Sequence, residues 1–181
     1  MPSYDDLVLT TQRLELRVPT IDDAQAIFDA YASDPRVTTY MDWRPSQHVT
    51  EVAERNAALA PDIAEGKRIP WVIRKLDEER LCGSIELRIE GDEGDVGYVL
   101  AASHWGQEIM PEALSAVLQF ALERLSLRRV RGICDVENRA SARVFEKCGF
   151  RWAGRREASV VHPNISDAPR DADCYEIELP P

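Results

Sequence analysis

The chain has 181 residues and carries 22 basic against 32 acidic side chains, which gives a formal net charge of −10. This length suits a single domain over residues 1–181 that buries a core of its own. The acidic balance argues against a general nucleic-acid binder. No apolar run approaches the roughly 18 residues that a membrane span needs, so we expect no membrane partner.

The cysteines and histidines form no pattern typical of a metal site. The four cysteines are scattered without a CxxC pair, and the three histidines do not cluster. We therefore expect neither a metal nor a disulfide framework. The first residues lack the apolar core of a signal peptide, and a reducing, cytoplasmic location follows as the expectation. The sequence leaves monomer and homodimer equally open.

The first third of the chain reads as one strand and two helical stretches. Apolar and charged residues alternate over 13–18, which predicts a half-buried strand. Thr20 and Asp23 resemble a capping box, and helical spacing follows over 21–33. An irregular, aromatic connection (34–45) leads to a second helical stretch over about 46–65, bent near Pro61.

The centre of the chain reads as three strands, over 69–75, 81–90 and 95–101, joined by short polar turns into an antiparallel meander. A loop follows, and then a helix that ends at Leu125, with Pro111 in its first turn.

The remaining chain reads as a strand over 130–136, a helix between Asn138 and Gly149, and strands over about 150–161 and 175–179 around a polar, turn-rich insert. The order β-α-α-β-β-β-α-β-α-β-β predicts an α/β fold with a mixed sheet. The strand–helix–strand unit over 95–136 implies a right-handed parallel crossover.

Charge is distributed unevenly along the acidic chain. Between Arg128 and Arg156 there are nine basic and three acidic residues. Such a segment is either a solvated, ion-paired face or a local site for a small polyanion such as a phosphorylated cofactor.

Two stretches carry a family resemblance: GYVL…HWGQEIMPEAL over 97–114 and ENRASARVFEKCGF over 137–150. Together they resemble the GNAT family of acyl-CoA-dependent N-acetyltransferases, in particular the branch that acetylates the N-termini of ribosomal proteins. TTQRLELR and DPRVTTYMDWRP near the N-terminus are similar to that branch as well. The resemblance implies the GNAT fold, a mixed central sheet flanked by helices. It also implies transfer of an acetyl group from acetyl-CoA to a primary amine, on a protein N-terminus or a small molecule.

The loop before Pro111 is the expected coenzyme site. A strand that ends in a loop opening a helix offers free N–H groups and a positive dipole end to a diphosphate. The resemblance places the coenzyme's pantetheine arm along the backbone of the preceding strand. The residues that it implies for the coenzyme are Val99, Leu100, Gly106, Gln107, Glu108, Ile109, Met110 and Asn138.

Glu108 departs from the family's loop, which usually has glycine at that position. A β-carbon there restricts the backbone if φ is positive, and a carboxylate beside a phosphate weakens binding. Glu108 is then either a tolerated surface residue, pointing to solvent or pairing with a base, or the mark of a weakened acyl-CoA site. Asn138 is similarly a plain helix cap, a cofactor contact, or both.

Acyl transfer to an amine needs a neutral amine, an oxyanion donor and a proton for the thiolate. Ser141 is the candidate proton donor, because a hydroxyl is out of place among the apolar residues of its helix face; it can instead bond its own helix start. Glu86, on a central strand, is the candidate base, with an exposed ion pair as the alternative. His104 and His162 are further candidates for proton transfer, but loop histidines are more often surface groups. A water relay is a further route for the proton.

Tyr40 and Trp43 flank Asp42 in the aromatic connection between the early helices. In the family this region walls the acceptor site, where aromatic side chains would hold an apolar neighbour of the amine and Asp42 would attract its charge. Trp43 can instead plug the core. Two rival hypotheses remain: a non-catalytic acyl-CoA or nucleotide-binding module with a degenerate loop, and a scaffold without a cofactor.

Overall fold

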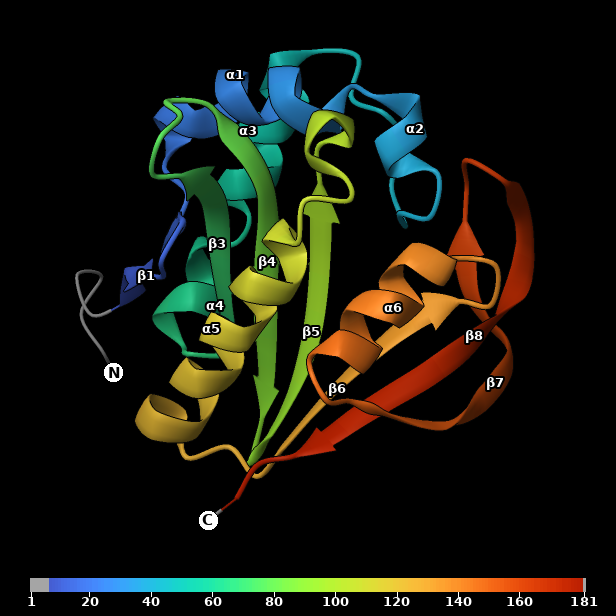
Figure 1. Cartoon of the computed structure of the whole chain (residues 1–181). Coiled ribbons are helices and arrows are strands. Elements are labelled where there is room, and N and C mark those ends of the chain that lie inside the picture. The colour runs from blue at the N-terminus through green and yellow to red at the C-terminus, as the bar shows by residue number, and fades with distance from the viewer. Residues whose placement is uncertain (1–6, 181) are drawn as a thin grey trace.

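The computed structural model describes residues 7–180 and is built on one twisted, eight-stranded sheet (Figure 1). The strands follow the order β1-β2-β3-β4-β5-β6-β8-β7, and every neighbouring pair is antiparallel except β5 with β6. Their bounds are β1 Leu9–Thr10, β2 Leu14–Arg17, β3 Arg68–Lys75, β4 Leu81–Glu90, β5 Glu93–Leu100, β6 Arg129–Asp135, β7 Arg151–His162 and β8 Ser166–Glu178.

Helices cover both faces of the sheet (Figure 1). They are α1 Ala24–Ile27, α2 Pro35–Thr38, α3 Val49–Ala57, α4 Ala60–Ala64, α5 Ile109–Leu125 and α6 Arg139–Lys147. The ring of Trp71 on β3 lies edge-on to Phe120 of α5, with ring centroids 5.6 Å apart, in the main core. The next residue, Val72, packs on the opposite face in the smaller cluster formed with α1 and α3. Alternation along β3 therefore separates the two cores.

The sheet opens between β5 and β6. These strands pair over only three residues, Glu93–Asp95 against Arg129–Arg131, and beyond Asp95 the strand β5 has β4 as its only neighbour. In Figure 1 the two strands run apart from this point. The gap is bridged on one face by the Tyr98 ring, whose centroid lies 5.5 Å from that of Phe145 on α6. The middle of the sheet thus contains a free strand edge.

The predicted fold class is confirmed, as are the antiparallel meander β3–β4–β5 and the parallel pair around α5. The structure adds the short strand β1 and places α2 in the segment expected to be irregular. Asp34 starts α2 by accepting a hydrogen bond from the Arg36 N–H at 2.9 Å, with Pro35 in the first turn.

The expectation of a polar, turn-rich insert before residue 175 is wrong, because β8 already begins at Ser166. Most side chains of the β7–β8 hairpin near its tip are exposed or half-buried, on both faces of the ribbon. The alternation that signals a half-buried strand is therefore missing from its sequence.

Gly132 on β6 is a test of the packing behind the gap. A Cβ at this position would lie 2.4 Å from two ring atoms of Phe145, whose ring stacks on Tyr175 at 5.2 Å. We predict that Gly132→Ala lowers the free energy of unfolding in urea by about 1–3 kcal/mol, because the aromatic cluster must shift. Ile133→Thr, at a half-exposed neighbour, is the control with the smaller effect. Equal effects of the two variants would contradict this packing.

Candidate active site

Arg13 fixes the loop that precedes α5. Its guanidinium donates hydrogen bonds to the carbonyls of Gln107 (3.0 Å) and Glu108 (3.2 Å), and its Nε donates to the Glu112 carboxylate at 2.6 Å. Burial opposes the charge of Glu112, but hydrogen bonds from Thr11 and Arg13 hold the pKa of that carboxyl below its usual range. The loop carbonyls are therefore held from one side by a residue that is distant in sequence.

The amides of the same loop have no protein partner. Within residues 7–180, no protein group accepts a hydrogen bond from the backbone N–H groups of residues 106–110. Gly106, with φ +74°, and Glu108, with φ +60°, adopt the left-handed conformation that turns the chain into α5. Five N–H groups at the positive end of a 17-residue helix form a site suited to a diphosphate.

Glu108 is the first residue before α5, and its carboxylate forms an exposed ion pair with Lys147 of α6 at 2.5 Å. The side chain of Glu108 pairs with a base, as expected of a tolerated surface residue. Its backbone nevertheless has the positive φ that disfavours a β-carbon, as expected of a weakened coenzyme site. Its charge is therefore partly compensated, while the strain remains.

The free edge of β5 lies beside this loop. The Val99 carbonyl points toward β4, because a Cβ built on Gly83 would lie 2.5 Å from that oxygen. Alternation along an antiparallel strand then turns the backbone groups of Tyr98 and Leu100 toward the open edge. The Leu100 carbonyl accepts a hydrogen bond from the Trp105 indole at 2.9 Å. The donors left on this edge are thus offered by Tyr98 and Leu100 rather than by Val99.

The start of α6 closes the gap from the other side. Asn138 caps this helix, because its side-chain oxygen accepts a hydrogen bond from the Ser141 N–H at 3.2 Å. The Tyr98 hydroxyl donates to the Ser141 carbonyl at 3.1 Å, and burial raises the pKa of Tyr98, which keeps it protonated. The Ser141 side chain also lies beside the Tyr98 hydroxyl, because hydrogen bonding with Ser141 opposes the rise in the pKa of Tyr98. Ser141 does not use its hydroxyl to cap its own helix.

A row of bases follows the exposed side of α6. Arg139, Arg143 and Lys147 are spaced four residues apart, which places them on one helix face. Lys147 reaches the loop before α5 through Glu108, whereas neither arginine forms an ion pair within residues 7–180. The basic segment of the sequence therefore contains both ion-paired and unpaired bases, and two of the unpaired ones lie on the helix next to the loop.

The opposite face of β4 and β5 is polar. Glu86 lies across from Gly97 in register, and Arg68 donates to both of its carboxylate oxygens at 2.7 and 2.8 Å. Next to it, Arg88 pairs with Asp95 at 3.2 Å. Burial is the largest influence on Asp95 and raises the pKa of this carboxyl, although Arg88 opposes the rise. Glu86 thus forms the ion pair that was its alternative role, and no oxygen of its carboxylate is left free of Arg68.

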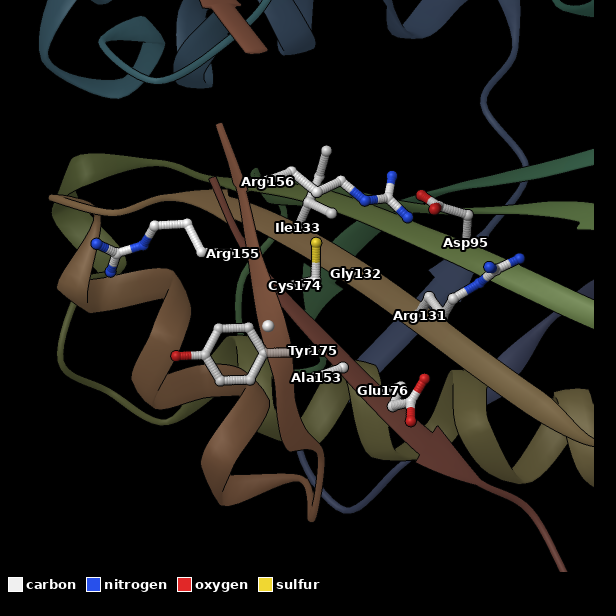
Figure 2. Close-up of a pocket in the computed structure, with 11 residues that line it drawn as sticks. Asp95, Arg131, Gly132, Ile133, Ala153, Arg155, Arg156, Cys174, Tyr175 and Glu176 are labelled. Atoms are coloured by element: carbon white, nitrogen blue, oxygen red, sulfur yellow. The ribbon is translucent and has the colours of Figure 1, made fainter. Parts of the chain in front are cut away.

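This polar face continues into a groove of about 340 Å³ across β6, β8 and β7 (Figure 2). Figure 2 shows the Arg156 guanidinium and the Asp95 carboxylate pointing toward each other across it, although no ion pair joins them. Ile133 and Cys174 form part of its floor, while Tyr175 points to the other face of the sheet. The groove is open to solvent and carries charges of both signs.

The loop after α2 is tied to the tip of the β7–β8 hairpin. The Asn164 amide donates to the carbonyls of Thr38 (2.6 Å) and Trp43 (2.8 Å). The Trp43 ring packs against the smaller core and carries Arg55 4.5 Å above it. Tyr40 stays half-buried, and its ring meets His162 edge-on with centroids 5.8 Å apart. Trp43 and Tyr40 are therefore both half-buried, and Trp43 packs against the smaller core.

His162 is buried, so the expectation of a surface histidine is wrong. Its Nε2 lies 3.5 Å from the Asp135 carboxylate, and neither ring nitrogen has a hydrogen-bond partner. Burial opposes ionisation of Asp135, but hydrogen bonds from Arg170 and the Glu137 N–H hold the pKa of that carboxyl below its usual range. The sequence gives no sign of this cluster, because its members lie on three strands.

His104 lies beside the start of the loop and, unlike His162, has hydrogen-bond partners. Its ring nitrogens contact the Ser103 hydroxyl at 2.9 Å and the Glu78 carboxylate at 3.1 Å. No group of histidine, cysteine, aspartate and glutamate side chains in the described part of the chain has the arrangement of a metal site. No helix between residues 7 and 180 is both long and apolar enough to cross a membrane.

Comparison with known proteins identifies the family. The model of the acetyltransferase (GNAT) domain matches residues 13–151, which is most of the chain. The chain belongs to the GNAT family. The family resemblance read from the sequence is confirmed, and with it an acyltransferase that uses acetyl-CoA. A cytoplasmic location stays a prediction.

Relatives of the chain are similar over nearly its whole length. The uncharacterized N-acetyltransferase YoaA of Bacillus subtilis is 28% identical over 96% of this chain and 97% of its own. Among solved structures, RimL, a ribosomal L7/L12 α-N-protein acetyltransferase in complex with coenzyme A, has a TM-score of 0.86 at 21% identity over 95% and 98% of the two chains. The Microcin C7 self-immunity acetyltransferase MccE, in complex with acetyl-CoA and AMP, has a TM-score of 0.83 at 17% identity over 93% and 94%. At these identities the two structures show the fold.

The Asp135–Arg170 pair predicts how stability depends on pH. The pKa of Asp135 is lowered in the folded state, so the pair stabilises the protein above the unfolded-state pKa near 4 and this stabilisation is lost as the pH falls through the folded-state value. We predict that Asp135→Asn lowers the free energy of unfolding by about 1–3 kcal/mol near pH 6.

The difference in the free energy of unfolding between Asp135→Asn and wild type should narrow as the pH is lowered toward about 3, as measured by urea unfolding at each pH. Asp167→Asn is the matched control, because this carboxylate is 89% exposed although it pairs with Arg44 at 3.2 Å. A difference from wild type that stays constant over the pH range would contradict the role of the Asp135 charge.

Proposed function

We propose that this chain transfers an acetyl group from acetyl-CoA to a primary amine, with the coenzyme held between the loop before α5 and the start of α6. The observation that carries the proposal is the set of five unpartnered amides at 106–110 next to the free edge of β5. The diphosphate would take those amides, and the pantetheine arm would pair with the backbone of Tyr98 and Leu100. Val99 would then contact the arm through its side chain.

The row of bases on α6 is suited to bind the remaining phosphate of the coenzyme. Arg139 and Arg143 have no acidic partner among the described residues, and an unpaired guanidinium suits a phosphate in two-point contact. Lys147 would divide its charge between Glu108 and the diphosphate. Gln107, Ile109 and Met110 would contribute through their amides, because the Gln107 side chain donates to the Ser103 carbonyl at 2.9 Å.

The chemistry follows from the position of Ser141 on the far side of the gap. The amine lone pair attacks the thioester carbonyl to form the C–N bond, the C–S bond breaks, and the sulfur takes the proton that the nitrogen loses. A Ser141 hydroxyl that lies beside the Tyr98 hydroxyl and does not cap its own helix is suited to pass that proton to the thiolate. Asn138 would act by setting the direction of α6. Glu86 would shape the charge of the acceptor face through its pair with Arg68.

We place the acceptor amine on the opposite face of β5, between the polar strand residues and Tyr40. The acidic chain favours a cationic acceptor by steering. The groove across β6, β8 and β7 offers space for an extended substituent, which favours the N-terminus of a peptide over a compact amine. Trp43 would support this wall from the core side.

The test is a calorimetric titration with acetyl-CoA together with an assay of free-thiol release against a panel of small amines and peptides. We expect saturable binding and amine-dependent thiol release, faster with an N-terminal peptide than with a compact amine. Binding without thiol release would instead indicate a non-catalytic coenzyme-binding module, and no binding a scaffold.

Glu108→Gly should tighten acetyl-CoA binding about tenfold. It removes both the strain of a left-handed residue that carries a β-carbon and a carboxylate next to a diphosphate. Glu108→Gln keeps the strain and removes the charge, so calorimetry on the two variants separates these effects. An unchanged dissociation constant in both would mean that Glu108 does not affect the coenzyme.

Ser141→Ala should lower kcat at least tenfold while the acetyl-CoA dissociation constant stays within a factor of about two, since the hydroxyl acts in the chemical step. The control is Ser115→Ala on α5, whose hydroxyl donates to the Pro111 carbonyl at 2.8 Å. A normal kcat in the Ser141 variant would remove this residue from the mechanism.

A further inference from the structure

The proposed reaction starts with an ammonium ion that must lose a proton, and the sequence-predicted base is poorly suited to accept it. Both oxygens of Glu86 accept hydrogen bonds from Arg68. Both oxygens are therefore occupied by Arg68 rather than left for the amine. The proton acceptor has to be sought among the other titratable groups around the acceptor face.

His162 is unusual among the side chains of this face. Its side chain is 8% exposed, and both ring nitrogens are buried without a hydrogen-bond partner. Within residues 7–180, it is the one side chain that leaves two buried polar atoms unsatisfied. Because an unsatisfied buried polar atom costs about 1–3 kcal/mol, such a group requires a ligand, a water or a function.

A carboxylate that is itself held by other groups lies beside the His162 ring. The Asp135 carboxylate, fully buried, lies 3.5 Å from Nε2 and is itself held by Arg170 at 2.6 Å and by the Glu137 N–H at 2.9 Å. The Glu137 carboxylate also binds Arg170. With a proton on Nε2 facing Asp135, the lone pair of the neutral imidazole is on Nδ1.

The position of the cluster links it to both halves of the proposed site. Asp135 ends β6, the strand that leaves β5 at the gap, and the chain reaches the α6 cap three residues later. On the other side, the Tyr40 ring lies edge-on to the imidazole. The Tyr40 hydroxyl has no hydrogen-bond partner among the described residues, and burial, the largest influence, raises the pKa of this phenol.

We propose that His162, positioned by Asp135, is the general base that deprotonates the acceptor amine, with Tyr40 against its ring. This inference rests on the proposed acetyl transfer. Because Nδ1 is buried in the free protein, binding of the acceptor has to expose it. The ammonium then loses one proton to Nδ1, and the freed lone pair forms the C–N bond. The C–S bond breaks, and the second proton that the nitrogen loses goes to sulfur by way of Ser141. The imidazolium then returns its proton to water, so that each turnover releases one proton.

The experiment measures kcat/KM for thiol release as a function of pH in wild type, His162→Ala and His162→Gln, with the amine that wild type acetylates best. Wild type should lose activity about tenfold per pH unit below the pKa of the base. The His162 variants should lose about 10²–10⁴-fold in kcat/KM and no longer show that acid limb. Added imidazole should restore His162→Ala at least tenfold, because the deleted ring leaves a cavity of its own shape.

Three comparisons make the result decisive. His48→Ala, at an exposed histidine before α3, should behave as wild type. Asp135→Asn should lower kcat/KM and shift the acid limb, whereas a structural role alone would leave the limb in place. Thermal unfolding and acetyl-CoA calorimetry are measured on each variant. His162→Gln should match wild type in both, so it replaces His162→Ala as the test if the alanine variant folds poorly.

The failures are distinguishable. If wild type binds acetyl-CoA and releases no thiol with any amine, the proposed function is wrong, and this inference with it. If wild type is active and both His162 variants keep its rate and its acid limb, the proposed function stands and His162 is not the base. A rate loss without a change of the pH profile and without rescue by imidazole would also overturn the inference.

Discussion

The hydrogen bonds of Arg13 to the loop before α5 determine what this molecule can bind. A guanidinium at the start of β2 takes the carbonyls of Gln107 and Glu108 and is itself held by Glu112. Buried or ordered backbone normally has its polar groups paired. Here the carbonyls of Gln107 and Glu108 are paired, whereas the amides of residues 106–110 are not, so this part of the loop presents more free donors than free acceptors. The rest of the coenzyme site depends on this asymmetry.

A second stretch of backbone without hydrogen-bond partners, the free edge of β5, lies next to the loop before α5. The parallel contact of β5 and β6 ends after three residues, and the Tyr98–Phe145 contact keeps the strands apart beyond it. Closing the gap would displace this aromatic packing from the core. The sheet therefore keeps a free edge, which on one face meets the loop and α6 and on the other meets the polar residues of β4. A thioester in the gap would be reached by a coenzyme from one face and an amine from the other.

The sequence predicts what depends on local chemistry. Alternation over residues 13–18 indicated β2, Pro111 indicated the first turn of α5, and Asn138 was correctly identified as the cap of α6. The family motifs identified the family. The pairs that join distant segments could not be predicted, because nothing in the sequence links Arg13 to Gln107, Lys147 to Glu108 or His162 to Asp135. The hairpin tip was misread for a related reason: a solvated ribbon carries no alternation, so the burial of His162 against β6 was invisible.

Hydrogen exchange of the backbone amides with and without acetyl-CoA tests the central claim most directly. If the unpaired donors hold the coenzyme, the amides of residues 106–110 and those of Tyr98 and Leu100 exchange fast in the free protein and become protected on binding, while Val99 is slow in both states. Protection confined to other segments, with these amides unchanged at saturating acetyl-CoA, would contradict the account.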